Sequence, residues 1–544
     1  MKLLCLTGLI STLWLTSCGN QKDVTIEIST NSIHKINPMI FGHFLEKPSW
    51  GGEIGIEAAF DNAKFHLQPG LYSLLDSMNI PVLRFPGGTD IDHIDWRDMV
   101  SNIPGRESKE RPTSIGQTGT EVTNLFGYDE MLNLSQSLKA EPILVVNFGA
   151  GYYGEKLLRE AANDAAALVA YCNADLKDTL PEELAIYPKL RAKNGQTDPW
   201  KVKYWQIANE PWVLDRNLKL NGDISDSLRN HYYDCINAYI NAMRAVDPTI
   251  KIILDGNSHE LSQHLNKSVA NYDLVAYHMY YPWQVDYYTR NGKEYLPDSL
   301  SKQEIWYSWT AMPQVDPQGF SILDNPGFQN AKIPQKPIAV TEWNWNGWWG
   351  GKVGKEVPAS RFAKGVGAAG MLHSMMRSGN IEMACQSMLV GNSWDITGIR
   401  VDKKNDFAPY FFPSGLITAF YSSLHGENML RIKANNIPTI DQPYKMNEVD
   451  AKDKVALLDI LATGDDQHVF LHVINRAYDQ DLDATINLPQ NAVSVIQHIY
   501  KGSVENLPPD QPTAWLEKNQ IAQTGKKIKV SFPKRTVSIV EFEL

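Results

Sequence analysis

The stretch PILVVNFGAGYYGEKLLREAANDAAALVAYCNADL, residues 142–176, contains the two patterns that decide the fold. Its first part, Pro142–Phe148, is a nearly continuous apolar run, which is typical of a strand buried on both faces of a parallel sheet. Its second part, Glu155–Leu176, repeats apolar residues with the period of a helix. A buried strand followed by a helix is the repeating unit of α/β proteins.

The same unit recurs on both sides of this stretch. The further apolar runs are Met39–Leu45, Pro81–Phe85, Val202–Ala208, Ile250–Leu254, Leu274–Tyr280, Pro337–Thr341 and Ile381–Leu389. Helical periodicity is clearest at Tyr128–Leu138, Leu228–Ala245 and Ala359–Arg377. Eight strand–helix units predict an α/β fold of the (β/α)8 TIM-barrel type, and a doubly wound sheet is the alternative.

After Gly426 the helical periodicity ends and short strands follow one another. They are Val455–Ala462, His468–Val473, Ala484–Leu488, Ser494–Tyr500, Ile528–Phe532 and Val537–Phe542. Regularly spaced short strands predict a C-terminal antiparallel β-sandwich domain. We therefore expect a signal peptide at 1–18, a tether with a strand that joins the sandwich at 19–36, the barrel at 37–426 and the sandwich at 427–544.

The N-terminus has the pattern of a targeting segment. Lys2 is followed by the apolar run Leu3–Leu15 and then by Leu15-Thr16-Ser17-Cys18, which resembles a bacterial lipobox. We predict lipidation of Cys18, export, and anchoring to a membrane of the bacterial cell envelope; an ordinary secretory signal with a chance Cys is the alternative. The remaining cysteines, Cys172, Cys235 and Cys385, have no paired spacing and predict neither disulfides nor a zinc site.

Composition excludes several classes of protein. The chain has 544 residues, of which 43% are hydrophobic and 21% charged, as in ordinary globular proteins. A net charge of −11 argues against a nucleic-acid partner. The acidic stretch TDIDHIDWRD, Thr89–Asp98, has Ile94 and Asp95 where a calcium loop needs a ligand and a glycine. We expect no metal and no cofactor.

Two glutamates close predicted strands. Glu210 lies in KVKYWQIANEPW (Lys201–Trp212), and Glu342 lies in KPIAVTEWNWNGWW (Lys336–Trp349). Barrel active sites form at the C-terminal ends of the strands. Retaining glycoside hydrolysis needs such a pair, one acid/base and one nucleophile, about 5–5.5 Å apart. We predict Glu210 as the acid/base and Glu342 as the nucleophile; two loop glutamates that cap nearby helices are the alternative.

Residues next to the pair suggest further roles. Asn209 can hydrogen-bond a sugar hydroxyl, and Tyr280 can hold Glu342 ionised through a hydrogen bond. His278 is expected beside the nucleophile as a supporting group or a substrate contact, with a purely structural histidine as the alternative. Trp345, in NWNGWWGG (Asn344–Gly351), is expected to line a sugar subsite, although such tryptophans also pack in cores.

Together these motifs resemble clan A glycoside hydrolases, and more specifically family 51, best known for α-L-arabinofuranosidases. INPMIFGHFLEK (Ile36–Lys47) is similar to the family's first strand, and PVLRFPGGTDIDHIDWRD (Pro81–Asp98) to its second. The resemblance implies that Glu46, Thr89 and Trp96 contact the substrate, with Thr89 standing where the family commonly has Asn. In IEMACQSMLVGN (Ile381–Asn392) an ungapped match places Met388 where the family usually has a Gln that faces the substrate, and Gln386, two residues earlier on the same predicted strand face, is expected to take that role.

The resemblance implies a retaining glycoside hydrolase that cleaves terminal α-L-arabinofuranosyl, or related furanosyl, residues from polysaccharides or oligosaccharides by double displacement. No cofactor is needed for this chemistry. An endo-acting glycanase with the same catalytic pair, and a non-catalytic surface glycan-binding lipoprotein, are the alternatives. Family members are often oligomeric, so a homo-oligomer is compatible with the resemblance.

Overall fold

The computed structural model describes residues 23–61, 66–106, 110–311, 336–345, 348–349, 360–402, 407–447, 449–505 and 511–544. The predicted signal peptide, Cys18 and part of the Asn344–Gly351 stretch lie outside these ranges. Within them, every helix is too short or too polar to cross a membrane.

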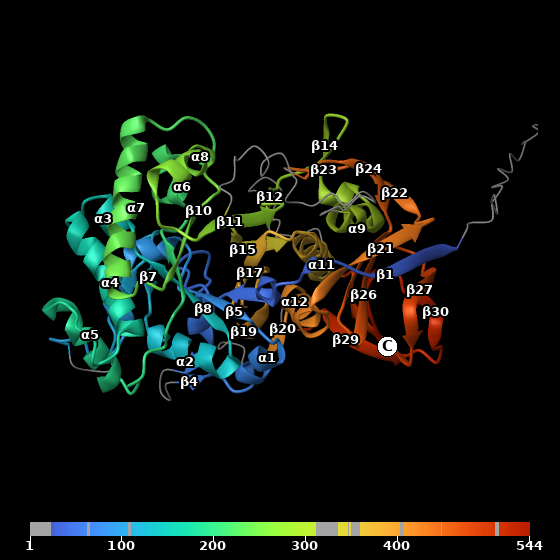
Figure 1. Cartoon of the computed structure of the whole chain (residues 1–544). Helices are drawn as coiled ribbons and strands as arrows, with labels where there is room; N and C mark the ends of the chain where they lie inside the picture. Colours follow the sequence, from blue (N-terminus) through green and yellow to red (C-terminus); the bar gives the residue numbers. More distant parts are fainter. Residues whose placement is uncertain are drawn as a thin grey trace, which may run out of the picture.

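Eight parallel strands close into a barrel in chain order (Figure 1). They are β2 (Gly42–Phe44), β5 (Val82–Phe85), β8 (Glu141–Val146), β9 (Tyr204–Ile207), β10 (Lys251–Asp255), β11 (Leu274–Tyr281), β15 (Ile338–Trp345) and β17 (Ile381–Ser387). One of these strands forms in each predicted apolar run. The TIM-barrel prediction is therefore confirmed, and the doubly wound alternative is wrong because β2 and β17 pair and close the sheet.

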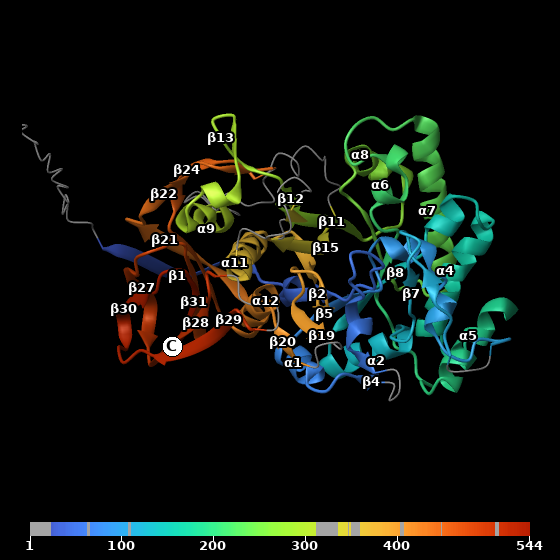
Figure 2. The same cartoon turned by 180° about the vertical axis from the view of Figure 1, so that it is seen from behind.

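Helices follow the strands and cover the outside of the barrel (Figure 2). The longer ones are α1 (Leu71–Ser77), α2 (Tyr128–Leu138), α4 (Leu158–Asn173), α5 (Glu182–Lys193), α7 (Asp226–Val246), α8 (His259–Ser268), α9 (Lys302–Thr310), α11 (Arg361–Arg377) and α12 (Pro413–Ser423). Short helices lie in the loops, at η2 (Gly55–Ala59), η3 (Thr89–His93), η4 (Trp96–Met99), α3 (Gly149–Tyr152) and α6 (Pro211–Leu214).

Small sheets also form in the loops. The two-stranded sheets are β3 (Phe60–Asp61) with β4 (His66–Leu67), β6 (Ser114–Ile115) with β7 (Glu121–Val122), β12 (Gln284–Val285) with β16 (Trp348–Trp349), and β22 (Thr439–Gln442) with β24 (Lys452–Ala456). In one three-stranded sheet β13 (Tyr288–Arg290) lies between β14 (Lys293–Tyr295) and β23 (Lys445–Met446). In the other, β19 (Ile399–Asp402) lies between β18 (Val390–Gly391) and β20 (Phe407–Phe411).

Toward the N-terminal ends of its strands, the interior of the barrel is filled by apolar side chains. Every strand contributes to one buried cluster, which contains Phe44, Val82, Ile143, Tyr204, Ile253, Leu274, Ala276, Ala339, Met383 and Cys385. Successive side chains on a strand point to opposite faces, so the residue two positions further along also points inward. By this rule Arg84 on β5, Gln206 on β9 and His278 on β11 form the next layer, toward the C-terminal end of the barrel.

The second domain is one nine-stranded sheet in the order β29-β28-β31-β26-β25-β21-β1-β27-β30. Its strands are β1 (Val24–Lys35), β21 (Asn428–Asn435), β25 (Leu458–Gly464), β26 (His468–Asn475), β27 (Leu482–Ala492), β28 (Ser494–Gly502), β29 (Ala514–Gln520), β30 (Gly525–Phe532) and β31 (Thr536–Glu543). Residues from both ends of this sheet share one core cluster, so the sheet folds over itself as the predicted sandwich. The N-terminal β1 pairs antiparallel with β21 and parallel with β27, and it lies among the C-terminal strands in Figure 1.

A buried ion cluster joins the sandwich to the barrel. Asp459 on β25 accepts hydrogen bonds from Arg377 of α11 at 2.7 Å and from Arg476 at 2.9 Å, and it lies 3.1 Å from His373. Burial alone would raise the pKa of Asp459, but the charges of Arg377, His373 and Arg476 outweigh it and hold that pKa well below its usual range. The sandwich is therefore fixed to the barrel through an ionised aspartate.

Candidate active site

An irregularity in β15 turns Glu342 into the barrel. Ala339 on this strand points inward, so strict alternation would also place Thr341 inward and Glu342 outward. The register between β11 and β15 shifts at Tyr277–His278, and Glu342 becomes the partner of His278. Bulges of this kind re-aim side chains next to active sites.

Glu210 reaches the same end of the barrel from a tight turn after β9. Ala208 and Glu210 both have positive φ, at 66° and 45°, a region that is costly for residues with a side chain. Pro211 then begins the short helix α6. The strained turn directs the Glu210 carboxyl group toward the centre of the barrel.

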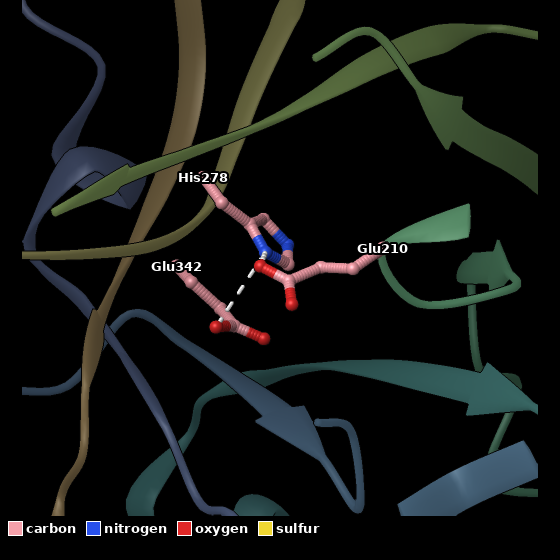
Figure 3. A group of neighbouring side chains, drawn as sticks. All are labelled: Glu210, His278 and Glu342. Carbon is pink, nitrogen blue, oxygen red and sulfur yellow. Dashed lines mark hydrogen bonds and ion pairs between the residues drawn. The ribbon is translucent and has the colours of Figure 1, made fainter. Parts of the chain in front are cut away.

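The side chains of Glu210, His278 and Glu342 point toward one another at this end of the barrel (Figure 3). His278 Nδ1 lies 2.8 Å from Glu210 Oε1 and 3.5 Å from Glu342 Oε2. One oxygen of each carboxyl group lies within 4.8 Å of the other. This limit on the nearest oxygen–oxygen distance is compatible with the roughly 5–5.5 Å between the carboxyl groups of retaining glycosidases.

Glu342 is held as a carboxylate. Arg84 Nη1 donates to its Oε1 at 2.7 Å, and the Tyr280 hydroxyl donates to its Oε2 at 2.8 Å. Burial raises the pKa of Glu342, but the charges of His278 and Arg84 and the hydrogen bond from Tyr280 outweigh burial and lower that pKa. An ionised, oriented carboxylate is what nucleophilic attack requires.

Arg84 is a site residue that the sequence prediction missed. It is fully buried, and besides Glu342 it donates to Gln206 at 2.8 Å and to Asn209 at 2.7 Å. Its guanidinium also lies over the ring of Phe44. The available signal was a charged residue inside an apolar strand, since arginine is almost never fully buried unless it is paired.

Asn209 has a donor to spare. Its oxygen accepts the bond from Arg84, and its buried Nδ2 has no partner among the described residues. A buried amide donor without a partner costs free energy, so a ligand oxygen that accepts from it would bind favourably. This agrees with the predicted bond from Asn209 to a sugar hydroxyl.

His278 is fixed on all sides. Its Nε2 lies 3.0 Å from Thr341 Oγ1, and its backbone N–H donates to Asn257. Burial opposes a charged imidazole, but Glu342 and Glu210 outweigh burial and raise the pKa of His278. His278 thus links the two carboxyl groups and is more than a structural histidine.

Glu46 follows the end of β2 and faces the same centre. A Cβ on Gly88 would lie 2.2 Å from Glu46 Oε1, so the glycine allows the loop after β5 to close on this carboxyl group. Burial, with the charges of Glu342 and Asp90, raises the pKa of Glu46 well above its usual range. A protonated Glu46 can donate a hydrogen bond, and half-buried Thr89 lies next to Gly88 at the start of η3.

Two predicted contacts point away from this centre. Trp345 lies on the outward face of β15, where it packs edge-on against Trp309 and over Gly367 of α11. On β17, Met383 and Cys385 point into the barrel, so Gln386 points outward. There it accepts a hydrogen bond from Thr418 of α12. Both predictions are wrong, since the two side chains lie in the helix layer.

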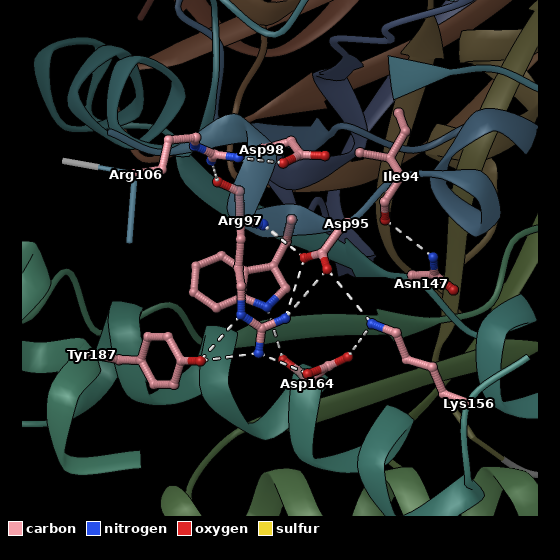
Figure 4. Close-up of polar contacts among 10 residues, drawn as sticks. Ile94, Asp95, Arg97, Asp98, Arg106, Asn147, Lys156, Asp164 and Tyr187 are labelled. Carbon is pink, nitrogen blue, oxygen red and sulfur yellow. Dashed lines mark hydrogen bonds and ion pairs between the residues drawn. The ribbon is translucent and has the colours of Figure 1, made fainter. Parts of the chain in front are cut away.

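Trp96 is also misassigned. Its indole N–H donates to the Asp164 carbonyl, and its ring packs against Tyr171 and Tyr187. The neighbouring Arg97 bonds Asp95, Asp164 and Tyr187 (Figure 4). This network fixes the loop after β5 to α4 and α5, so Trp96 acts in loop packing and not in substrate contact.

Glu210, His278 and Glu342 are also of the types that bind metal ions. Arg84 and Tyr280 already donate to both oxygens of Glu342, and the guanidinium charge repels a cation at this position. The donor set therefore suits proton transfer between two carboxyl groups better than metal coordination.

Comparison with known proteins agrees with this chemistry. A model of the α-L-arabinofuranosidase 1 domain matches residues 74–297, which include Glu210. The probable α-L-arabinofuranosidase C of Aspergillus clavatus is 31% identical over 247 residues, 44% of this chain and 43% of that protein. The probable α-L-arabinofuranosidase C of Aspergillus niger is 27% identical over 510 residues, 88% of this chain and 90% of that protein.

The fold is shared with solved structures of α-L-arabinofuranosidases. The thermostable family 51 α-L-arabinofuranosidase from Thermotoga petrophila has a TM-score of 0.70 at 20% identity, covering 96% of this chain and 100% of that one. The TIM barrel, the sandwich and the pair of glutamates occur here in one chain. In fold, in its matched domain and in its pair of glutamates, the chain is therefore similar to α-L-arabinofuranosidases of glycoside hydrolase family 51.

Proposed function

We propose that this protein releases terminal α-L-arabinofuranosyl, or related furanosyl, residues from polysaccharides or oligosaccharides, with retention of anomeric configuration. The observation that carries the proposal is the spacing of Glu210 and Glu342, whose nearest oxygens lie within 4.8 Å with His278 between them. The names of the similar proteins from Aspergillus support the choice of sugar.

The first step forms a glycosyl-enzyme. Glu342 attacks the anomeric carbon while Glu210 gives its proton to the glycosidic oxygen, so the bond to the leaving group breaks as the ester to Glu342 forms. In the second step Glu210 takes a proton from water, and the water oxygen attacks the anomeric carbon and displaces Glu342. Arg84 and Tyr280 then receive the released carboxylate in bonds already formed in the free enzyme.

Substrate binding would use donors at the same end of the barrel. The free Nδ2 of Asn209 can donate to a hydroxyl next to the reacting carbon, and a protonated Glu46 can donate to another sugar oxygen. Thr89 remains a predicted contact at this end of the barrel.

An NMR time course with an aryl α-L-arabinofuranoside tests the proposal. We expect the α anomer of arabinose as the first product, followed by slow mutarotation. Glu342→Gln should abolish the release of arabinose. The inverted anomer as first product, or no cleavage of any aryl furanoside by the wild-type protein, would contradict the assignment. Digestion of intact arabinan separates the two modes of action, because an exo enzyme releases monosaccharide and an endo enzyme releases oligosaccharides.

We also propose that the protein is exported and lipid-anchored through Cys18. The support is the sequence alone: Lys2, the apolar run Leu3–Leu15 and the lipobox-like ending at Cys18. Expression in a bacterium with an alkyne-tagged palmitate should label the wild-type protein and not the Cys18→Ala variant. Label on both, or on neither, would contradict the anchor. A homo-oligomer remains a prediction for light scattering to test.

A further inference from the structure

A groove of roughly 370 Å³ lies beside the active site. Its walls come from the loop after β2 and from the β6–β7 hairpin, which lies between β5 and α2. Both segments follow the C-terminal ends of neighbouring barrel strands, so the groove opens at the same end of the barrel as Glu210 and Glu342. None of the residues assigned above to the reaction lines it.

Hydrogen bonds connect the groove to Asp90, a residue close to the substrate side of the active site. Asp90 is one of the charges that raise the pKa of Glu46, and its Oδ1 accepts a hydrogen bond from Ser49 at 2.8 Å. Ser49 lines the groove, and its carbonyl accepts a bond from the Thr118 hydroxyl on the opposite wall. Asp90, whose charge acts on Glu46, is therefore connected to the groove through Ser49 and Thr118.

One wall of the groove is an aromatic platform. Trp50 packs on Trp394, with ring centroids 4.2 Å apart, and 36% of Trp50 stays exposed. An exposed tryptophan face on a fixed support offers a flat apolar surface for a sugar ring.

A buried carboxylate holds this platform in place. Glu53 is 1% exposed, and its two oxygens accept five backbone N–H bonds of 2.7–3.1 Å. The donors come from two loops: Ile54, Gly55, Asn392, Ser393 and Trp394. Since the carboxylate ties the loop after β2 to the loop after β17, Trp50 and Trp394 are pre-organised, which lowers the entropy cost of binding.

The lining also defines the charge of the ligand. The hydroxyls of Thr118 and Thr120 can bond a polyol, while the ionisable lining residues are Glu53, Glu57 and Glu121. Lys47, behind the lining, is paired with Glu57 and so neutralises one of these three charges. The charges of Glu53 and Glu121 still leave the lining acidic, which disfavours uronates and phosphates. The chemistry that remains is that of an uncharged sugar.

We propose that this groove is a distal subsite, which binds an uncharged sugar unit of the glycan that carries the scissile furanoside. The inference rests on the proposed function, because it places the rest of the substrate beside the site that cleaves it. On this proposal an aryl glycoside occupies only the catalytic site, whereas an arabino-oligosaccharide occupies both sites.

Kinetics of Trp50→Ala test the subsite. The ratio of kcat/KM for an arabino-oligosaccharide to that for an aryl α-L-arabinofuranoside should fall about tenfold, which corresponds to about 1.4 kcal/mol. Trp50→Phe should restore most of the ratio. Trp515→Ala is the matched control, since Trp515 is an exposed tryptophan on the distant edge strand β29. An unchanged ratio in Trp50→Ala would overturn the proposal.

Affinity electrophoresis separates failure of the subsite from failure of the proposed function. Gels that contain neutral arabinan should retard the wild-type and Trp515→Ala proteins more than Trp50→Ala, and gels that contain polygalacturonate should retard none of them selectively. If the wild type cleaves no furanoside but shows this pattern, the groove binds a neutral glycan as proposed and the proposed function is wrong. Equal retardation of all three proteins by arabinan, or stronger retardation by polygalacturonate, would overturn the proposal that the groove is a subsite for an uncharged sugar.

Discussion

Replacing Tyr280 by Phe isolates one of the three contacts that keep Glu342 ionised. The change removes the 2.8 Å hydrogen bond to Oε2 and leaves Arg84 at 2.7 Å from Oε1 and His278 at 3.5 Å from Oε2. A hydrogen bond to a charged group contributes about 1.5–3 kcal/mol. At 1.36 kcal/mol per pH unit, the pKa of Glu342 should rise by about 1–2 units.

The sign of the effect follows from the role of Glu342. Its pKa is lowered in the wild type, so the nucleophile loses its charge only at low pH. In Tyr280→Phe the acidic limb of kcat/KM against pH should move upward by about 1–2 units. The assay is hydrolysis of an aryl α-L-arabinofuranoside across the acidic range, with circular dichroism to confirm folding. Tyr277→Phe is the control, because Tyr277 lies on the same strand and points outward. An acidic limb that stays in place, or moves to lower pH, refutes the reasoning.

The other predictions concern the acid/base, the buried arginine and the domain interface. Glu210→Ala should lower kcat/KM by about 10²–10⁴ for poor leaving groups and little for a dinitrophenyl furanoside, whose leaving group needs no proton; equal losses on both would count against general acid catalysis. Arg84→Met should destabilise the fold by about 3–5 kcal/mol in urea unfolding, because it breaks the buried ion pair with Glu342 and leaves the oxygens of Gln206 and Asn209 without their donor; an unchanged unfolding midpoint would contradict this. The folded pKa of Asp459 is depressed, so its stabilisation is present above its unfolded pKa of about 3.9 and lost as the pH falls toward the folded value. Asp459→Asn should therefore lower the unfolding temperature at pH 7, with a difference that narrows in acid; a difference independent of pH would show that the charge is not what matters.

The sequence predicted the barrel because its strands are buried on both faces. Runs such as Pro81–Phe85 and Ile250–Leu254 are apolar for that reason, and each forms a strand close to its predicted bounds. Glu210 and Glu342 could be found because each follows such a run, and the C-terminal ends of parallel strands meet at one end of a barrel.

The side of the strand on which a residue lies was harder to predict. The irregularity in β15 turns Glu342 inward and leaves Trp345 outward, and nothing in the local sequence marks the shift. Gln386 was predicted as a substrate contact from the family resemblance, but Met383 and Cys385 occupy the inner face of β17, so Gln386 points outward to Thr418. Arg84 was missed because its partners Gln206, Asn209 and Glu342 come from other strands, and only the closed barrel brings them together.

Mapping of the covalent intermediate tests the central claim most directly. Glu210→Ala with a dinitrophenyl α-L-arabinofuranoside should complete the first step and accumulate the glycosyl-enzyme, since the second step lacks its base. Peptide mass spectrometry of the quenched reaction should find one pentosyl group, attached to Glu342. A pentosyl group on any other residue, or complete turnover to the inverted sugar without a covalent species, would contradict the account.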